Sequence, residues 1–220
     1  MPPPSDTKAA ALRSHSWTQD PEGVKRNILA AAREAFVEHG FAGARVDDIA
    51  ARTETSKRMI YYYFGDKRGL YVAVLEDAYA GIRGHEQQLD LTVLPPREAL
   101  ARLAGETFDY HARYPDFVRL VMDENIHYAR HIEKSERVQA VNNTALSTIG
   151  AIYDRGLAEG VFRAGLEPID IHLTISALAF YNVSNRATIR ALFAHDMGSP
   201  AALARRRVQV IDTVLLFVQA

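Results

Sequence analysis

The 220-residue chain contains no cysteine. Without thiols it can form no disulfide, no thiolate metal site and no cysteine nucleophile. It also has little net charge, because 26 Lys and Arg residues stand against 27 Asp and Glu residues, so bulk charge indicates no nucleic-acid partner. Charged residues and prolines interrupt every apolar run before the roughly 18–20 residues that a membrane span needs. The composition therefore predicts neither a disulfide-stabilised protein nor a membrane protein.

The first twenty residues are rich in proline and small polar residues. They contain no continuous apolar region and so are not a secretory signal, and we expect a cytoplasmic location. We expect 1–20 to form a disordered arm. This arm either lies along DNA through Lys8 and Arg13 or is a solvated tail, and the second interpretation is favoured.

Sequence signatures of catalysis are also missing. There is no GxSxG elbow, no P-loop and no dinucleotide-binding glycine fingerprint, so we expect no catalytic residues and no cofactor. Glu124, His127 and His131 do share one helical stripe at metal-ligand spacing. No second cluster completes such a site, so a solvated face or pairing with a neighbouring helix is favoured, and no metal site is predicted.

Apolar residues recur at helical spacing from Asp20 onward, which predicts an all-α fold. The segment MIYYYF at 59–64 also has the composition of a β-strand, but no partner strand is apparent anywhere in the chain. Proline, glycine and capping residues indicate where the helices begin and end. The expected helices are 21–40, 46–52, 57–64, 67–89, 97–114, 116–132, 135–159, 168–194 and 200–218.

The stretch RVDDIAARTETSKRMIYYYFGDKR, at 45–68, indicates two short helices joined by a tight turn, which is a helix-turn-helix. Ser56 caps the second helix, and its first turn is where such a motif presents side chains to base edges. Ile60 and Phe64 are four residues apart and are expected to pack inward. At least two of the three successive tyrosines at 61–63 must then be exposed beside Lys and Arg, where phosphates or thymine methyls can bind them.

Behind a scaffold helix, the segments FAGARVDDIA and TSKRMIYYYFGDKRGLY resemble the DNA-binding domain of the TetR (tetracycline-repressor) family over residues 22–75. The resemblance implies an all-helical, dimeric transcriptional repressor that a small organic effector releases from double-stranded operator DNA. It implies a helix-turn-helix DNA-binding domain at 21–66 and a ligand-binding and dimerisation domain at 67–220. The alternatives are a transcriptional activator, or a helical dimer that acts as a plain ligand-binding or interaction module.

The resemblance also implies roles for individual residues of this motif. Positions that contact bases are matched by Lys57, Arg58 and Tyr61, and positions that contact phosphates by Tyr62, Tyr63 and Lys67. The full predicted DNA-contacting set is Arg45, Ser56, Lys57, Arg58, Met59, Tyr61, Tyr62, Tyr63 and Lys67.

Two positions depart from the family pattern. Arg45 stands where a capping Thr or Ser is usual, so the side-chain cap of that helix should be lost. Glu54 replaces the usual glycine of the turn and would adopt a left-handed conformation at a cost of about 1 kcal/mol.

The last two expected helices, 168–194 and 200–218, are apolar over more than one face and would leave a large exposed patch on a monomer. The resemblance implies that they pair with their copies in a four-helix homodimer interface. A two-fold dimer places its DNA-reading helices about 34–36 Å apart and predicts a palindromic operator.

A small-molecule site is expected between helices of the C-terminal part, as an apolar cavity with a few polar groups. For each candidate, core packing or the dimer interface is the alternative. The predicted ligand-binding residues are Tyr110, Met122, Asn125, Tyr128, Phe180, Tyr181 and Asn185.

Overall fold

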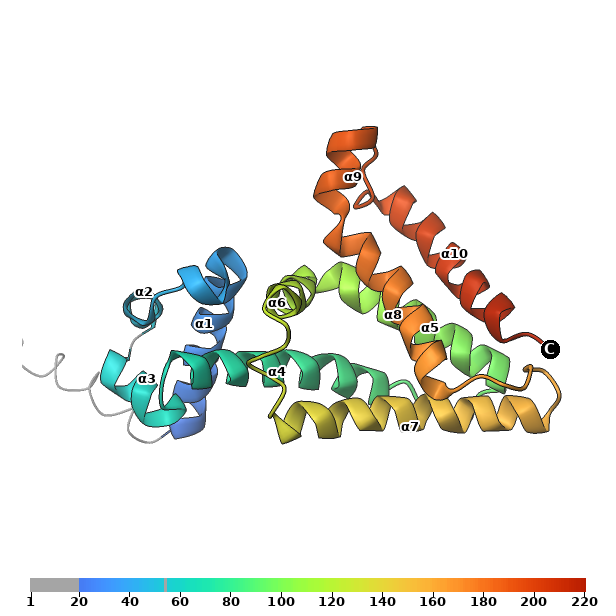
Figure 1. Cartoon of the computed structure of the whole chain (residues 1–220), viewed down its shortest axis with the longest axis horizontal. Helices are drawn as coiled ribbons and strands as arrows, with labels where there is room; N and C mark the ends of the chain where they lie inside the picture. The colour runs from blue at the N-terminus through green and yellow to red at the C-terminus, as the bar shows by residue number, and fades with distance from the viewer. Residues whose placement is uncertain (1–19, 54) are drawn as a thin grey trace, which may run out of the picture. The chain divides into compact units, whose positions relative to one another are not determined.

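The computed structural model describes residues 20–53 and 55–220 and confirms an all-α fold (Figure 1). Residues 1–19 of the expected arm at 1–20, and the expected conformation of Glu54, lie outside the described residues. One isolated β-bridge, between Phe162 and Gln219, joins the C-terminus to the segment after α7. The helices are α1 Pro21–Gly43, α2 Val46–Ala51, α3 Lys57–Phe64, α4 Lys67–Gln87, α5 Pro96–Arg113, α6 Pro115–Ile126, α7 Glu136–Ala158, α8 Pro168–Ser184, α9 Arg186–Phe193 and α10 Pro200–Val218.

The chain forms two compact units, and the division between them falls between Val74 and Leu75, inside α4. The first unit contains α1 to α3 and the start of α4, and the second contains the remainder. The domain boundary predicted from the sequence, between 66 and 67, stays a prediction.

In the N-terminal unit, side-chain caps define where the helices start. The Asp20 carboxylate accepts a hydrogen bond from the Gly23 amide at 2.8 Å, as expected for an N-cap. Gly40, with φ of 65°, interrupts the helical conformation of α1 at the predicted place. The core includes Ile28 and Phe36, and the ring of Phe36 meets that of Tyr71 edge-on at 4.9 Å. These contacts fix the scaffold on which α2 and α3 sit.

In the C-terminal unit, α5 is the central helix and packs against α6, α7, α8 and α10 (Figure 1). The main hydrophobic core of this unit is formed by residues of α5, α7, α8 and α10, for example Leu100, Ile152, Ile175 and Val214. A Cβ at Gly156 would overlap the ring of Phe162, so only glycine permits this close approach.

Two expected helices are wrong in extent. The helix predicted over 116–132 ends at Ile126, because the Glu124 carboxylate accepts hydrogen bonds from the His131 and Ile132 amides at 2.8 and 3.2 Å and folds the next residues back. The helix predicted over 168–194 is two helices that meet at Asn185. Asparagine there bonds locally to the Ser184 hydroxyl at 2.8 Å, and such side-chain bonds compete with helix formation.

Across the described part of the chain, every helix is too short or too polar to span a lipid bilayer.

Candidate functional sites

The first candidate site is the α2–turn–α3 motif. Arg45 precedes α2 without a side-chain cap, as the sequence predicts. The Thr53 hydroxyl donates to the Ala50 carbonyl at 3.0 Å and closes the end of α2. The Ser56 hydroxyl then accepts a hydrogen bond from the Met59 amide at 3.4 Å, which starts α3 with the capping geometry expected. The motif is therefore a helix-turn-helix.

The helix α3 has one buried side and one exposed side. Ile60 is fully buried and anchors the helix, while Phe64 is half-buried. Tyr61 and Tyr62 are 40% and 76% exposed, which confirms that at least two of the three tyrosines point outward. Lys57 and Arg58 are exposed as well, and Met59 and Tyr63 are half-buried. The exposed side thus combines cations with aromatic surface, a composition suited to phosphates and base edges.

Lys57 is held within the protein by an acid of α2. Its ammonium lies 2.8 Å from Oδ1 of Asp47 and 5.9 Å from the centre of the Tyr61 ring. The hydrogen bond to Asp47 raises the pKa of Lys57, and the same bond lowers the pKa of Asp47. Lys57 therefore remains charged, but a DNA ligand competes with Asp47 for it.

Lys67, at the start of α4, also has partners in the protein. Its ammonium donates to the Ala42 carbonyl at 3.3 Å and lies 4.9 Å from the centre of the Phe41 ring. Partial burial lowers its pKa. Two donor positions of the ammonium stay available for a phosphate, because a lysine carries three. In addition, Asp66 accepts from the Gly69 amide at 2.7 Å and caps this helix as predicted.

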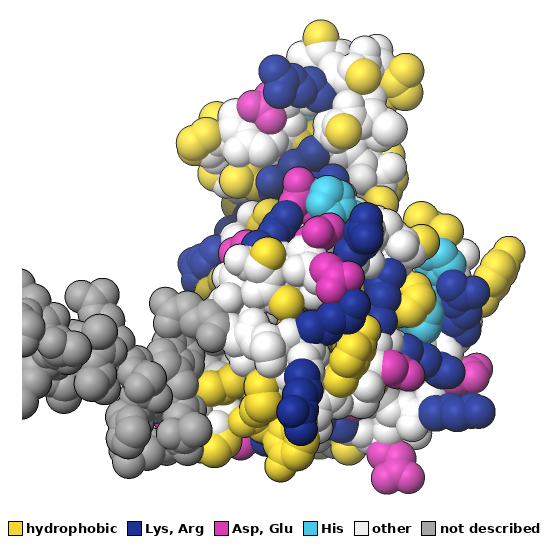
Figure 2. Space-filling model, turned by 90° about the vertical axis from the view of Figure 1, so that its left-hand side faces the viewer, with side chains coloured by type: hydrophobic (Ala, Val, Ile, Leu, Met, Phe, Trp, Pro, Cys, Tyr) yellow, Lys and Arg dark blue, Asp and Glu magenta, His cyan; other side chains and the backbone are white. Residues whose placement is uncertain are grey.

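The basic character of this unit is local. In the space-filling view, Lys and Arg side chains lie among hydrophobic and acidic ones and do not merge into one continuous basic surface (Figure 2). This distribution agrees with the near-zero net charge of the chain.

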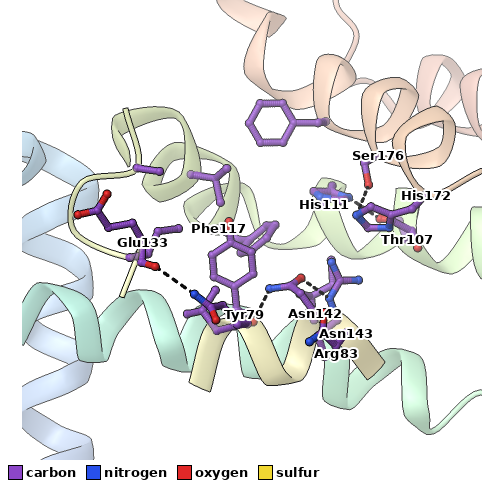
Figure 3. A pocket seen from close by; sticks show the side chains of 17 residues that line it. Tyr79, Arg83, Thr107, His111, Phe117, Glu133, Asn142, Asn143, His172 and Ser176 are labelled. Atoms are coloured by element: carbon purple, nitrogen blue, oxygen red, sulfur yellow. Dashed lines mark hydrogen bonds between the residues drawn. The ribbon is translucent and has the colours of Figure 1, made fainter. Parts of the chain in front are cut away.

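The second candidate site is a cavity of about 630 Å³ in the C-terminal unit (Figure 3). Helices α4 to α8 and the segment between α6 and α7 all contribute to its wall. Its volume lies within the range typical of small-molecule sites. The lining residues are Tyr79, Ile82, Arg83, Thr107, His111, Phe117, Val121, Ala129, Ile132, Glu133, Val138, Gln139, Asn142, Asn143, His172, Ser176 and Phe180.

Aromatic rings form much of this wall. Tyr79 meets Phe117 edge-on with ring centres 5.4 Å apart, and His111 lies 5.5 Å from Phe117. His111 also meets the ring of Phe180 edge-on, with ring centres 6.3 Å apart. Burial raises the pKa of Tyr79, so its hydroxyl stays protonated at neutral pH.

Two histidines in the cavity are neutral at physiological pH. Burial lowers the pKa of His111 to about 4 and that of His172 to about 4. The nearby Arg83 guanidinium contributes to both shifts. Figure 3 shows both rings close to Thr107 and Ser176 at one end of the cavity. At pH 7 the cavity therefore gains no positive charge from histidine.

The structure places the predicted ligand-binding residues unevenly. Phe180 alone of the seven lines this cavity. Asn125 is exposed and donates to the Val121 carbonyl at 2.9 Å. Tyr128 is 92% exposed, because α6 ends before it and its φ of 58° turns it outward. The cavity therefore receives neither of these polar groups, against the sequence-based expectation.

The remaining predicted residues lie elsewhere in the same unit. Tyr110 packs against Tyr114 at 4.5 Å, and Met122 is half-buried on α6. Tyr181 borders a separate hollow between α8 and α10, and Asn185 separates α8 from α9. Their roles in ligand binding stay predictions.

Eight of the seventeen residues that line the cavity show a pattern in the sequence. They are polar or aromatic–polar pairs that stand four apart on one helix, so the two members of each pair share a face. The pairs are Tyr79 and Arg83, Thr107 and His111, Gln139 and Asn143, and His172 and Ser176.

The helical stripe of Glu124, His127 and His131 does not form a metal site. Because α6 ends early, Glu124 and His131 are brought together by a turn, and His131 Nδ1 lies 2.8 Å from the Glu124 carboxylate. His127 bonds instead to the Asp123 carbonyl at 2.7 Å. Within residues 20–53 and 55–220, no cluster of three or more His, Cys, Asp or Glu side chains could hold a metal ion. The turn that Glu124 holds through the His131 and Ile132 amides contributes Ala129 and Ile132 to the wall of the cavity.

A helix-turn-helix with an exposed, basic and aromatic second helix, followed by a helical unit with an internal cavity, defines a helix-turn-helix transcriptional regulator. The chain belongs to the TetR family. Residues 28–74 match the family described as bacterial regulatory proteins, tetR family, and residues 96–214 match the tetracyclin repressor-like, C-terminal domain.

Individual relatives agree with this assignment. The chain is 35% identical to the HTH-type transcriptional repressor NicS of Pseudomonas putida, over 90% of this chain and 93% of that protein. It is 37% identical to the HTH-type transcriptional repressor SCO4008 of Streptomyces coelicolor, over 50% of this chain and 54% of that protein. Among solved structures, SCO4942 of Streptomyces coelicolor is similar with a TM-score of 0.66 at 29% identity, covering 89% of this chain and 98% of that one.

Proposed function

We propose that this protein is a transcriptional repressor that binds a palindromic operator as a homodimer and is released by a small organic effector. The observation that carries the proposal is the two-sided α3, which buries Ile60 and exposes cationic and aromatic side chains at the start of the helix. Two relatives, one of them similar along nearly the whole chain, are named as repressors.

In this proposal, α3 enters the major groove. Lys57, Arg58 and Tyr61 contact base edges, and Met59 packs against them. Tyr62, Tyr63 and Lys67 contact phosphates, and Arg45 and Ser56 lie where they can add further contacts. Support comes from exposure, since Arg45, Ser56, Lys57 and Arg58 are all exposed.

The dimer is proposed to form through α8 and α10. Both helices carry apolar side chains that the single chain leaves uncovered, including Leu173 on α8 and Leu216 on α10, which are 57% and 70% exposed. Scattered exposed apolar residues are common on monomers, but pairs of neighbouring helices that share them indicate an association surface. The short α9, expected within the same helix as α8, adds exposed Leu192 and Phe193 beside this surface.

The effector is proposed to bind the cavity of the C-terminal unit. Tyr79, Ile82 and Arg83 of its wall belong to α4, the helix that begins at Lys67. Ligand contacts with this helix are the proposed route to a change in DNA affinity. A ligand achieves release only if it binds the DNA-free state more tightly than the DNA-bound state.

Fluorescence anisotropy with labelled DNA from upstream of the protein's own gene tests the proposal. A repressor binds this DNA more tightly than scrambled DNA of equal length, and its addition lowers transcription from the same promoter in a purified system. Equal affinity for both DNAs would favour the plain ligand-binding module. Specific binding with increased transcription would favour an activator.

A further inference from the structure

The contacts of His111 in the wall of the cavity determine which of its ring nitrogens can accept a hydrogen bond from a ligand. Nδ1 of His111 lies 2.8 Å from the Thr107 carbonyl oxygen. A carbonyl oxygen can only accept, so Nδ1 carries the proton. The ring is 4% exposed, and in the neutral form its other nitrogen, Nε2, is a hydrogen-bond acceptor. A ligand beside this nitrogen must therefore supply a donor.

The cation in the wall of the cavity, Arg83, already has an acidic partner. Nη1 of Arg83 lies 2.7 Å from both oxygens of Glu86, and its Nε donates to Asn142 at 3.1 Å. The other charged residue of the wall, Glu133, is an exposed acid. A carboxylate ligand would lose its hydration without gaining an unpaired cation among the described residues of the wall, and such burial is costly.

The remaining surface favours a flat ligand with an acceptor. The rings of Phe117 and Phe180 lie 5.5 and 6.3 Å from that of His111, so an aromatic ring beside Nε2 would meet aromatic surface. Tyr79 brings a hydroxyl group that can donate to a carbonyl oxygen or a ring nitrogen, whereas the Ser176 hydroxyl already lies 3.4 Å from Nε2 of His172.

We propose that the cavity selects an uncharged, flat heteroaromatic ligand with an N–H or O–H group, and that this group donates to Nε2 of His111. A lactam, with N–H and C=O side by side, offers a donor for Nε2 of His111 and an acceptor for the Tyr79 hydroxyl. The inference rests on the cavity being the effector site proposed above.

Three bicyclic probes that differ in one group test the ligand class: 2-quinolone, 1-methyl-2-quinolone and quinoline-2-carboxylate. Their binding to the full chain is measured by calorimetry at pH 7.5 without DNA. We expect 2-quinolone to bind about tenfold more tightly than its methylated form, which is the effect of one hydrogen bond, and the carboxylate to bind most weakly. Equal binding of the first two probes, tightest binding of the carboxylate, or no binding of 2-quinolone would overturn the proposal.

A variant locates the acceptor. His111→Phe keeps an aromatic ring beside Phe117 and Phe180 and removes Nε2. It should weaken 2-quinolone about tenfold and leave the methylated probe unchanged. His85→Phe is the matched control, because His85 lies on α4 without lining the cavity. If His111→Phe retains the preference for 2-quinolone, or His85→Phe loses it, the assignment to His111 is wrong. Circular dichroism checks folding, and the probe comparison on the unaltered chain needs no variant.

The ligand class and the repressor function can fail separately. If the chain prefers 2-quinolone but binds no operator, the proposed ligand class is supported and the proposed repressor function is rejected. If the chain binds its operator but shows no preference among the probes, only the proposed ligand class is rejected.

Discussion

Lys57 and Arg58 begin the same helix, and among the described residues Lys57 alone of the two forms an ion pair, with Asp47 at 2.8 Å. If both read bases, replacement of either by alanine should cost about 1–3 kcal/mol of specific DNA binding and relax base preference. Lys57 must give up its ion pair with Asp47 in order to contact a base. Lys57→Ala should therefore lose less DNA-binding free energy than Arg58→Ala. Anisotropy titrations with operator DNA and single-base variants give both quantities.

Lys67→Ala is the matched control for these variants. A phosphate contact carries no sequence information, so affinity should fall alike for all DNAs and the salt dependence should decrease by about one unit of slope. A change in base preference for Lys67→Ala would contradict the roles assigned here.

His111 makes the stability of the fold dependent on pH. Its pKa is about 4 in the folded protein, below the ordinary value of 6.5, so between these values the unfolded chain binds a proton that the folded chain does not. Stability should therefore fall as pH falls through this window. When the pH is lowered from 7.5 to 5, the free energy of unfolding of His111→Gln should fall by about 2 kcal/mol less than that of the natural chain. Urea unfolding at the two pH values measures this difference. Equal losses would show that another group is responsible.

At the scale of the element, helix starts were the most predictable feature. Asp20, Ser56 and Asp66 cap helices at the predicted positions, because a capping side chain bonds to amides two or three residues ahead of it. Ends were less predictable where a residue distant in sequence decides them. Glu124 ends α6 by binding amides seven and eight residues further on, and periodicity does not reveal such a bond.

Two helical glycines have opposite expected effects. Gly156→Ala places a methyl group against the Phe162 ring and should destabilise the fold by about 1–3 kcal/mol. Gly84→Ala meets nothing within 4 Å and should stabilise it by about 0.4–1 kcal/mol, since alanine is the better helix former. Thermal unfolding of both variants measures the difference, and a stabilising Gly156→Ala would show that Phe162 can move aside.

At the scale of the whole molecule, the proposed dimer can be tested without DNA. Leu173→Glu or Leu216→Glu places a charge in the surface that α8 and α10 would bury, so each should shift the chain from dimer to monomer in analytical ultracentrifugation. Val93→Glu is a control, because Val93 is also exposed but lies outside both helices. A dimer that survives both leucine variants would place the interface elsewhere.

The sequence indicated the helical architecture and the exposed face of α3, but only one residue of the cavity. The helix-turn-helix is local, so the spacing of Ile60 and Phe64 determines which tyrosines point outward. The cavity instead collects side chains from five helices that are distant in sequence. Whether Tyr128 or His111 points inward depends on where α6 ends and how α5 is rotated, and tertiary packing decides both.

The division between the two compact units falls inside a continuous helix, at Val74 and Leu75, which are 1% and 0% exposed. Proteases cut exposed, flexible segments, so this division offers them no linker to cleave. Limited digestion should instead begin in a connection such as that between α9 and α10, where 194–196 are exposed. The DNA-reading half should therefore not be released as a separate fragment, and the two halves would be degraded together.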